Sequence, residues 1–239
     1  MTTPYEECAK CLASKFCPRY AGDVPKSEST FCRMHDRMYK TLALAEMPKR
    51  YLQANIYNCK VDDKNKAMYE TIKPVIDNIV EEVDNGVNVF FHGSNTGTGK
   101  TYHAAMLLNH YIYKTCGTRF DFEHPLAMYV DYALLIDNLR YLEDDTGIQE
   151  RFNIIMNVPI LLLDDLGAGT MSDFAREQTF LLLNHRFNNV LSTISTSNLS
   201  LKELTDDRKL GKRNVSRLLS NGMAIEVVGG DRRAKELRT

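Results

Sequence analysis

The sequence predicts an α/β fold, in which five parallel strands form one sheet that is flanked by helices. Three observations lead to this expectation. Short apolar segments alternate with helical patterns from residue 86 onward, a glycine-rich segment stands between one such strand and the next helix, and two adjacent aspartates close another strand. Apolar strands separated by helices are typical of a parallel sheet that is buried on both faces.

The part before residue 86 has a different character. Residues 1–45 are rich in Cys, Lys and Arg, and Gly22 and Pro25 interrupt any long periodicity, so we expect a small loop-rich module with one short helix near 33–45. Residues 46–66 are expected to be a linker. A helical pattern follows over 67–85, with a kink or boundary expected at Pro74. The main domain is therefore assigned to residues 67–239.

The elements of that domain follow from the periodicity of apolar residues. Strands are expected at 87–93, 126–131, 159–165, 190–198 and 223–229. Helices are expected at 100–116, 132–144, 148–157, 173–188, near 200–206 and at 211–220.

Composition places the chain among ordinary globular proteins. Of its 239 residues, 44% are hydrophobic and 26% charged, which argues against disorder throughout. The net charge of −1 means that any contact with nucleic acid must come from a local basic patch. No apolar run approaches the roughly 20 residues that span a bilayer, and the N-terminus lacks the layout of a secretory signal. We expect a cytoplasmic protein, in which clustered cysteines are metal ligands or buried thiols.

The segment HGSNTGTGKT, residues 92–101, is typical of a phosphate-binding loop and not merely of a Gly-rich turn. Small residues let backbone N–H groups turn toward phosphate oxygens, while Lys100 meets the terminal phosphates and Thr101 offers a hydroxyl to Mg²⁺. Ser94 stands where the usual first glycine belongs, and Gly93 beside it can supply the turn. The residues expected to hold a nucleotide here are Gly93, Ser94, Asn95, Thr96, Gly97, Thr98, Gly99, Lys100, Thr101 and Tyr102.

Polar side chains close two of the later strands. Asp164 and Asp165 follow the apolar run ILLL. The first is expected to hold Mg²⁺ through water, at the site that also includes Thr101, and the second to orient and deprotonate an attacking water. The structural alternative is that both acids cap the following turn. Asn198 closes the next strand and is expected at the same crevice, because ligands collect beyond the carboxyl ends of parallel strands.

Taken in order, GSNTGTGKT, ILLLDDLG, STSN and KRNVSRL resemble the AAA+ ATPases, and within them the DnaC/DnaI-like replicative helicase loaders and their IstB-like relatives. The resemblance covers about residues 46–233. It implies Walker A at Lys100 and Thr101, Walker B at Asp164 and Asp165, and sensor I at Asn198. It also implies ATP or ADP and Mg²⁺ as cofactors, with ATPase activity that is stimulated by self-assembly, DNA and helicase.

Further arginines gain roles from the same resemblance. Arg217, four residues after Arg213, is similar to the arginine finger that reaches a neighbouring subunit's ATP, and Arg233 or Arg232 is similar to sensor II. On residues alone, a helical arginine is as readily a solvated surface charge. A finger that acts in trans requires a head-to-tail interface, and such an interface generates rings or open spirals.

The two helices expected over 131–156 resemble the extra helical feature that faces single-stranded DNA in AAA+ initiators and loaders. Arg140, Tyr141 and Arg151 would offer backbone and stacking contacts there. A solvated helix face accounts for the same residues equally well.

Four N-terminal cysteines follow the spacing C-x2-C-x5-C-x14-C: Cys8, Cys11, Cys17 and Cys32, with His35 as an alternative fourth ligand. Thiolates at this density suit structural zinc, while an iron–sulfur cluster and free thiols remain alternatives. DnaI-type loaders carry an N-terminal zinc-binding domain that contacts the helicase, and this module is similar in position. Cys59 and Cys116 are expected to be buried thiols.

The function expected from this resemblance is ATP-dependent loading of a hexameric replicative helicase of the DnaB type onto single-stranded DNA during replication, in a bacterium or phage. The alternative is an IstB-like helper ATPase that acts on target DNA in transposition. A replication initiator is disfavoured, because about ten residues after the last strand leave no room for a duplex-reading domain. A nucleotide-gated binding protein without turnover is disfavoured by the pair of aspartates.

Overall fold

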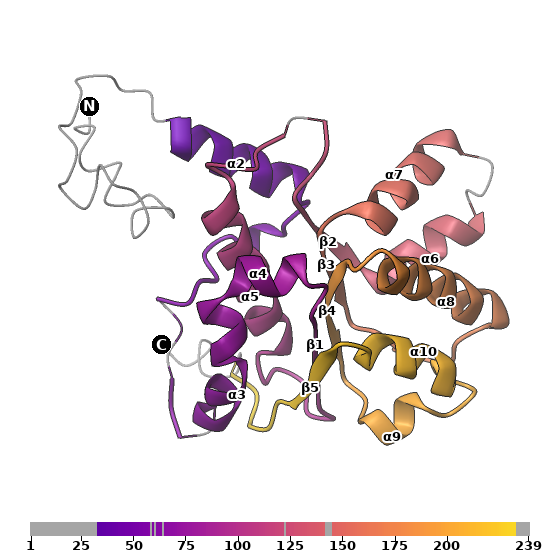
Figure 1. Cartoon of the computed structure of the whole chain (residues 1–239). Helices are drawn as coiled ribbons and strands as arrows, with labels where there is room; N and C mark the ends of the chain where they lie inside the picture. The colour runs from indigo at the N-terminus through magenta and orange to yellow at the C-terminus, as the bar shows by residue number, and fades with distance from the viewer. Residues whose placement is uncertain are drawn as a thin grey trace, which may run out of the picture.

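The computed structural model describes residues 33–57, 59, 61–63, 65–121, 123–141 and 145–232 (Figure 1). In this part of the chain, five parallel strands form one sheet in the order β2-β3-β4-β1-β5. The strands are β1 (Asn88–His92), β2 (Ala127–Asp131), β3 (Ile160–Asp164), β4 (Ser192–Ser197) and β5 (Gly222–Glu226). The expected α/β class with a five-stranded parallel sheet is confirmed.

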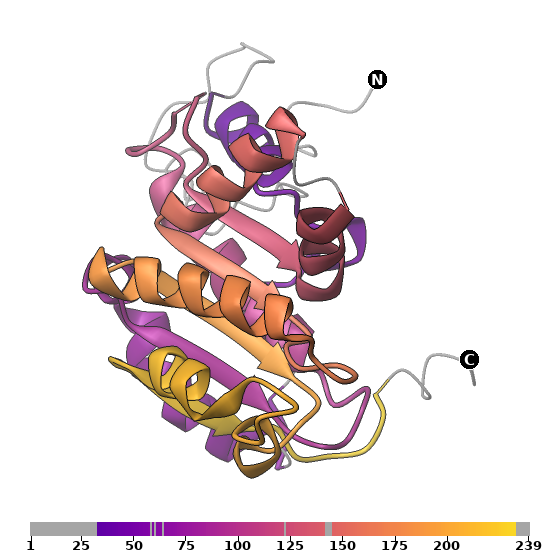
Figure 2. The same cartoon turned by 90° about the vertical axis from the view of Figure 1, so that its right-hand side faces the viewer.

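Helices cover both faces of this sheet, as Figure 1 shows. One face carries α2 (Arg33–Leu44), the short 3₁₀ helix η2 (Lys49–Tyr51), α3 (Lys66–Asp77), α4 (Ile79–Asp84) and α5 (Lys100–Thr115). The other carries α6 (Tyr132–Tyr141), α7 (Thr146–Asn157), α8 (Asp173–Asn188), α9 (Leu201–Leu204) and α10 (Gly211–Leu219). Figure 2 views the second face, where α8 lies across the middle of the sheet.

Successive residues of a strand face two different apolar cores, one on each side of the sheet. In β1, Phe91 packs into the cluster under α2–α5 and Phe90 into the cluster under α6–α10. All five residues of β1 are buried, whereas most of β5, at the edge of the sheet, is exposed. The near-continuous apolar runs in the sequence thus reflect burial on two sides, as parallel sheets require.

Helix α5 is the most enclosed helix, because it lies between the sheet and the layer formed by α2 and α4. Fully buried residues such as Tyr111 and Ile112 fix it against the strands. Its first residue, Lys100, directly follows the glycine-rich loop. The loop therefore begins from a buried strand and ends on a rigid helix.

The segment before residue 67 packs on this domain. Met38, Leu42 and Ala45 at the inner side of α2 are buried in the same core as α5. The amide of Asn109 on α5 donates to the carbonyls of Tyr51 at 2.8 Å and Ala54 at 2.9 Å. The division at residues 45 and 66 stays a prediction, but the described residues on both sides of it share one core.

The helical pattern over 67–85 divides later than expected. Pro74 lies inside α3, which continues to Asp77, and the break comes at Asn78. Asn78 donates to the carbonyl of Pro74 through its backbone N–H at 3.1 Å and its side chain at 3.3 Å. A proline near the end of a helix removes one hydrogen bond, which the rest of this short helix tolerates.

Among the residues that the structure describes, no helix has the length and apolar character needed to cross a bilayer.

Candidate nucleotide site

The glycine-rich loop joins the end of β1 to the first turn of α5, as expected. Three of its glycines have positive φ: Gly93 at 148°, Gly97 at 72° and Gly99 at 100°. A Cβ on Gly93 would stand 2.8 Å from the carbonyl oxygen of Val227, so a side chain is excluded by space as well as by φ. The turn thus starts at Gly93, which explains why Ser94 is acceptable at the next position.

Lys100 is buried, and its ammonium group bonds inside the loop. Nζ donates to the carbonyls of Gly93 at 2.9 Å and Asn95 at 2.7 Å, and lies 3.5 Å from Oγ1 of Thr98. The loop is therefore wrapped around a fixed positive charge at a helix N-terminus. This is the arrangement that favours a phosphate.

Asp164 at the end of β3 faces this loop. Its Oδ1 accepts from Oγ1 of Thr101 at 2.9 Å and of Thr196 at 2.6 Å, and its Oδ2 accepts from Oη of Tyr129 at 2.9 Å. A hydroxyl and a carboxylate in contact are hard oxygen donors of the kind that Mg²⁺ prefers. The residues present fit a magnesium–nucleotide complex, and the Thr101–Asp164 pair expected from the sequence is brought together.

Asp165 and Asn198 form the second part of the site. Nδ2 of Asn198 donates to Oδ1 of Asp165 at 2.7 Å. Asp165 has a positive φ of 60°, a conformation that is costly outside glycine and that often marks functional sites. The residue is exposed, yet partial desolvation of its carboxyl and, next, the charge of Asp164 raise its pKa, while the Asn198 bond lowers it. A carboxylate with a raised pKa is a better proton acceptor.

The C-terminal segment crosses the glycine-rich loop. Val227 donates to the carbonyl of His92 at 2.7 Å, Asn95 to that of Gly229 at 3.2 Å, and the N–H of Arg232 to that of Gly97 at 2.9 Å. The guanidinium of Arg232 lies 3.4 Å from Asp62. Arg232, one of the two candidates for sensor II, is therefore beside the loop, whereas Arg233 lies outside the described residues.

Arg217 and Arg213 lie on α10, on the opposite face of the sheet from α5 (Figure 1). The guanidinium carbon of Arg217 is 4.5 Å from the ring centre of Phe187, and that of Arg213 is 3.2 Å from the ring centre of Phe180. Both aromatic rings belong to α8. The structure thus holds Arg217 on the outer surface of α8 and α10.

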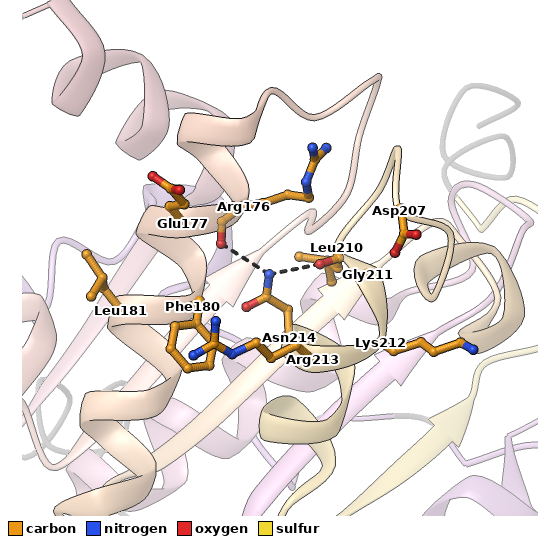
Figure 3. Close-up of a pocket in the computed structure, with 10 residues that line it drawn as sticks. All are labelled: Arg176, Glu177, Phe180, Leu181, Asp207, Leu210, Gly211, Lys212, Arg213 and Asn214. Carbon is orange, nitrogen blue, oxygen red and sulfur yellow. Dashed lines mark hydrogen bonds between the residues drawn. The ribbon is translucent and has the colours of Figure 1, made fainter.

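A cleft of about 570 Å³ lies on this α8–α10 surface (Figure 3). Phe180 and Leu210 line it together with the charged side chains of Arg176, Lys212 and Arg213. At its floor, Asn214 donates to the carbonyls of Arg176 at 3.1 Å and Leu210 at 2.8 Å, which ties α10 to α8 (Figure 3). The cleft is separate from the glycine-rich loop.

The insertion helices α6 and α7 carry the residues considered for single-stranded DNA. Arg140 donates to Oγ of Ser172 at 2.6 Å, and Arg151 makes a two-point ion pair with Glu46, at 3.1 and 2.7 Å. Tyr141 is 71% exposed. Arg140 is exposed as well, but both arginines are engaged in contacts within the chain.

The expected zinc ligands, Cys8, Cys11, Cys17 and Cys32, lie outside the described residues, as does the side chain of His35. Among the described residues, no three or more His, Cys, Asp or Glu side chains lie close enough together to hold a metal ion. Cys116 is buried and Cys59 half-buried, and neither is in a disulfide.

Sequence reasoning missed two hydroxyls of the site, Thr196 and Tyr129. Thr196 also accepts from the N–H of Asp165, at 2.9 Å, and so contacts both aspartates. The run STISTS forms β4, in which all six residues are buried, and hydroxyls in a fully buried strand were a usable signal. No comparable signal marks Tyr129.

Comparison with known proteins agrees with this geometry. The family model for IstB-like ATP binding proteins matches residues 27–239. The replicative helicase loader DnaI of Bacillus subtilis (strain 168) is 25% identical over 189 residues, which are 76% of this chain and 57% of that protein. The match thus spans little more than half the length of that relative.

Two solved structures have the same fold. A crystal structure of the DnaC helicase loader is 28% identical with a TM-score of 0.63, and the match covers 76% of this chain and all of that chain. A crystal structure of DnaI is 24% identical with a TM-score of 0.61, covering 78% and 94%. The second likeness supports the fold alone.

Proposed function

The chain belongs to the family of IstB-like ATP-binding proteins and has the AAA+ P-loop fold, and from this we propose that it loads a hexameric replicative helicase onto single-stranded DNA, using ATP, during DNA replication. The observation that carries the proposal is the contact of Thr101 with Asp164, directly after a loop wrapped around Lys100, in a chain whose fold resembles a DnaC helicase loader. Such a protein acts in the cytoplasm.

The site supports ATP hydrolysis. The glycine-rich loop and Lys100 would hold the phosphates, and Thr101 with Asp164 would hold Mg²⁺, which neutralises charge on the phosphates. Asp165 would accept a proton from the attacking water, and Asn198, at 2.7 Å from it, would orient that carboxylate. Asp is one methylene shorter than Glu, so Asp165 requires the water to lie close to the strand tip.

Completion of the site by a neighbour is part of the proposal. Arg217 lies over Phe187 on the α8–α10 surface, and α10 lies on the opposite face of the sheet from α5. An arginine held on an outer surface is placed to reach an ATP site on another copy, which implies head-to-tail assembly. The cleft beside Arg213 would lie in or next to that interface.

Arg217→Ala tests this assembly. Because the residue lies away from the loop, the variant keeps ATP affinity, and we expect its steady-state hydrolysis to fall by about 10³-fold in the assembled state. Mixing it with an Asp165→Asn protein should restore hydrolysis, since each supplies what the other lacks. Unchanged turnover by Arg217→Ala at concentrations that assemble would contradict the trans role. Arg50→Ala is the matched control, because it also removes a guanidinium over an aromatic ring, that of Tyr51, but on the other face of the sheet.

The partner is proposed from the relatives and the N-terminal cysteines. Residues 1–45 would bind zinc through Cys8, Cys11, Cys17 and Cys32 and dock on the helicase, while the α6–α7 surface with Tyr141 would meet single-stranded DNA. The IstB-like family also supports a second candidate, a helper ATPase in transposition.

A pull-down separates the two candidates. Tagged protein with ATP and Mg²⁺ should retain a replicative helicase from lysate of its own source, and deletion of residues 1–32, which keeps α2 and its buried Met38, should release it. Recovery of a transposase with no helicase would instead support the transposition helper.

A further inference from the structure

The magnesium carboxylate, Asp164, is held from both sides of its strand. Thr196 lies on β4 and Tyr129 on β2, the two strands that flank β3 in the sheet. Thr196 and Thr101 both donate to Oδ1 of Asp164. Among the described residues, Tyr129 is the one donor to Oδ2, at 2.9 Å. The three hydroxyls together fix the rotation of the carboxylate plane.

Tyr129 is itself held firmly. Its N–H donates to the carbonyl of Ala45 at 2.8 Å, at the end of α2, and its ring lies 6.4 Å from the ring of Tyr51. In the sheet register it pairs with Leu162, two residues before Asp164. The phenol therefore reaches along the sheet to the carboxylate from a fixed backbone.

The chemistry of this contact has one direction. A phenol has one O–H to donate and a carboxylate can only accept, so Oη of Tyr129 is the donor and Oδ2 of Asp164 the acceptor. Because the Tyr129 hydroxyl holds Oδ2 of Asp164, the other carboxylate oxygen, Oδ1, stays turned toward the hydroxyl of Thr101. Thr101 is the other expected magnesium ligand.

We propose that Tyr129 is a positioning residue for the metal: its hydroxyl holds Oδ2 of Asp164 so that Oδ1 and Thr101 present a preformed pair of oxygens to Mg²⁺. This role rests on the proposed nucleotide site. It adds a residue, Tyr129, that neither the glycine-rich loop nor the Asp164–Asp165 pair indicates. Groups that orient a metal ligand typically change metal affinity by about 10- to 100-fold when they are removed.

The test is a magnesium titration of nucleotide binding with Tyr129→Phe. This change removes the hydroxyl and keeps the ring against Tyr51. A fluorescent ATP analogue is titrated first in EDTA and then with increasing Mg²⁺, so the readout is binding and not turnover. We expect the Mg²⁺ concentration at half-maximal enhancement to rise about 10-fold, with affinity in EDTA unchanged.

Tyr132→Phe is the matched control. It removes another buried tyrosine hydroxyl, which bonds Thr179 at 2.7 Å and is separated from Asp164 by its place on α6. Its Mg²⁺ dependence should equal that of the wild type. Urea unfolding of both variants without nucleotide reports any loss of fold.

The outcomes are distinguishable. An unchanged Mg²⁺ dependence in Tyr129→Phe overturns the positioning role and leaves the nucleotide site intact. Equal loss of binding with and without Mg²⁺ also overturns it, because the hydroxyl then acts on the fold and not on the metal. If the wild type binds the analogue with no response to Mg²⁺, the magnesium role of Thr101 and Asp164 is refuted, and the positioning role with it. If the wild type does not bind the analogue at all, the proposed ATP site is refuted as well.

Discussion

Two polar groups at opposite ends of the sheet, Arg186 and Asp164, are both held by several hydrogen bonds, yet in different ways. Arg186 is 1% exposed and contacts the segments where β3 and β4 begin. It donates to Oγ1 of Thr193 and to four backbone carbonyls: Ile155, Met156, Val158 and Ser192. Asp164, where β3 ends, is half-buried and held by three side-chain hydroxyls.

The difference separates structure from function. Backbone carbonyls cannot turn away, so the Arg186 network is closed, and it satisfies the C-terminal carbonyls of α7. Burial lowers the pKa of Arg186 to about 9, which still leaves it a cation at neutral pH. The Asp164 network is open in another sense, because one of its three hydroxyls, that of Thr101, is itself expected to bind Mg²⁺. Ligands collect at the carboxyl ends of parallel strands, which is where the open network lies.

Breaking the closed network should have the largest effect on stability. Arg186→Met keeps the volume of the side chain but leaves several buried carbonyls without a donor, so we expect a loss of about 3 kcal/mol or more in the free energy of unfolding. Urea denaturation measures it. Arg213→Met, which removes an exposed guanidinium over Phe180, should cost less than about 1 kcal/mol. Equal losses in the two variants would contradict the contrast.

Breaking the open site should affect rate and not stability. Asp165→Asn removes the proton acceptor, so hydrolysis by the assembled protein should fall by about 10²- to 10³-fold, while ATP affinity and the unfolding midpoint change little. Asp77→Asn alters an exposed carboxylate on α3, which pairs with Lys73, and serves as the control. A loss of ATP binding in Asp165→Asn would show a structural role instead.

Two buried histidines on α5 should make the stability of the fold depend on pH. Burial lowers the pKa of His103 and His110 to about 4, below the ordinary 6.5. The unfolded chain binds protons first as the pH falls, so stability is full above 6.5 and declines toward 4. The decline is up to about 2 kcal/mol per histidine by pH 5. Urea unfolding of His110→Leu should show about half of that dependence, and an unaltered slope would contradict it.

The smallest expected effect is on the rate of ATP hydrolysis at low pH. The pKa of Asp165 is raised, so hydrolysis should decline, as the pH falls, above the ordinary aspartate value of 3.8. Asn198→Ala removes the hydrogen bond that lowers this pKa, and the decline should therefore shift to still higher pH. A pH–rate profile in the range where both proteins stay folded measures the shift. No displacement would exclude Asp165 as the group that titrates.

The sequence was informative where a pattern is local. The alternation of strands and helices predicted the sheet, and the motif at 92–101 predicted a loop between a buried strand and a helix that begins at Lys100. The position of Asp165 beside Asn198 also followed, because parallel strands end at one edge. These inferences need only the direction and order of elements.

What the sequence did not predict depends on register and packing. Arg186 stands in a helical pattern where an arginine is usually solvated, and the end of α7 and the start of β4 together bury it. Tyr129 looks like any aromatic residue of a buried strand, and its role depends on the offset between β2 and β3. Pro74 predicts a kink or boundary, but α3 tolerates it near its end. Contacts such as Ala45 with Tyr129 are set by tertiary packing alone.

In the proposed function, ATP bound at the site of Lys100 and Asp164 drives the placement of a helicase ring on DNA. The most direct test uses covalently closed circles of single-stranded DNA, onto which a closed ring cannot thread. Purified helicase is incubated with the protein and ATP, and helicase retained on the circles is measured after a salt wash. We predict retention with the wild type and none with Lys100→Ala. Equal retention with Lys100→Ala, or none with the wild type, would contradict the claim.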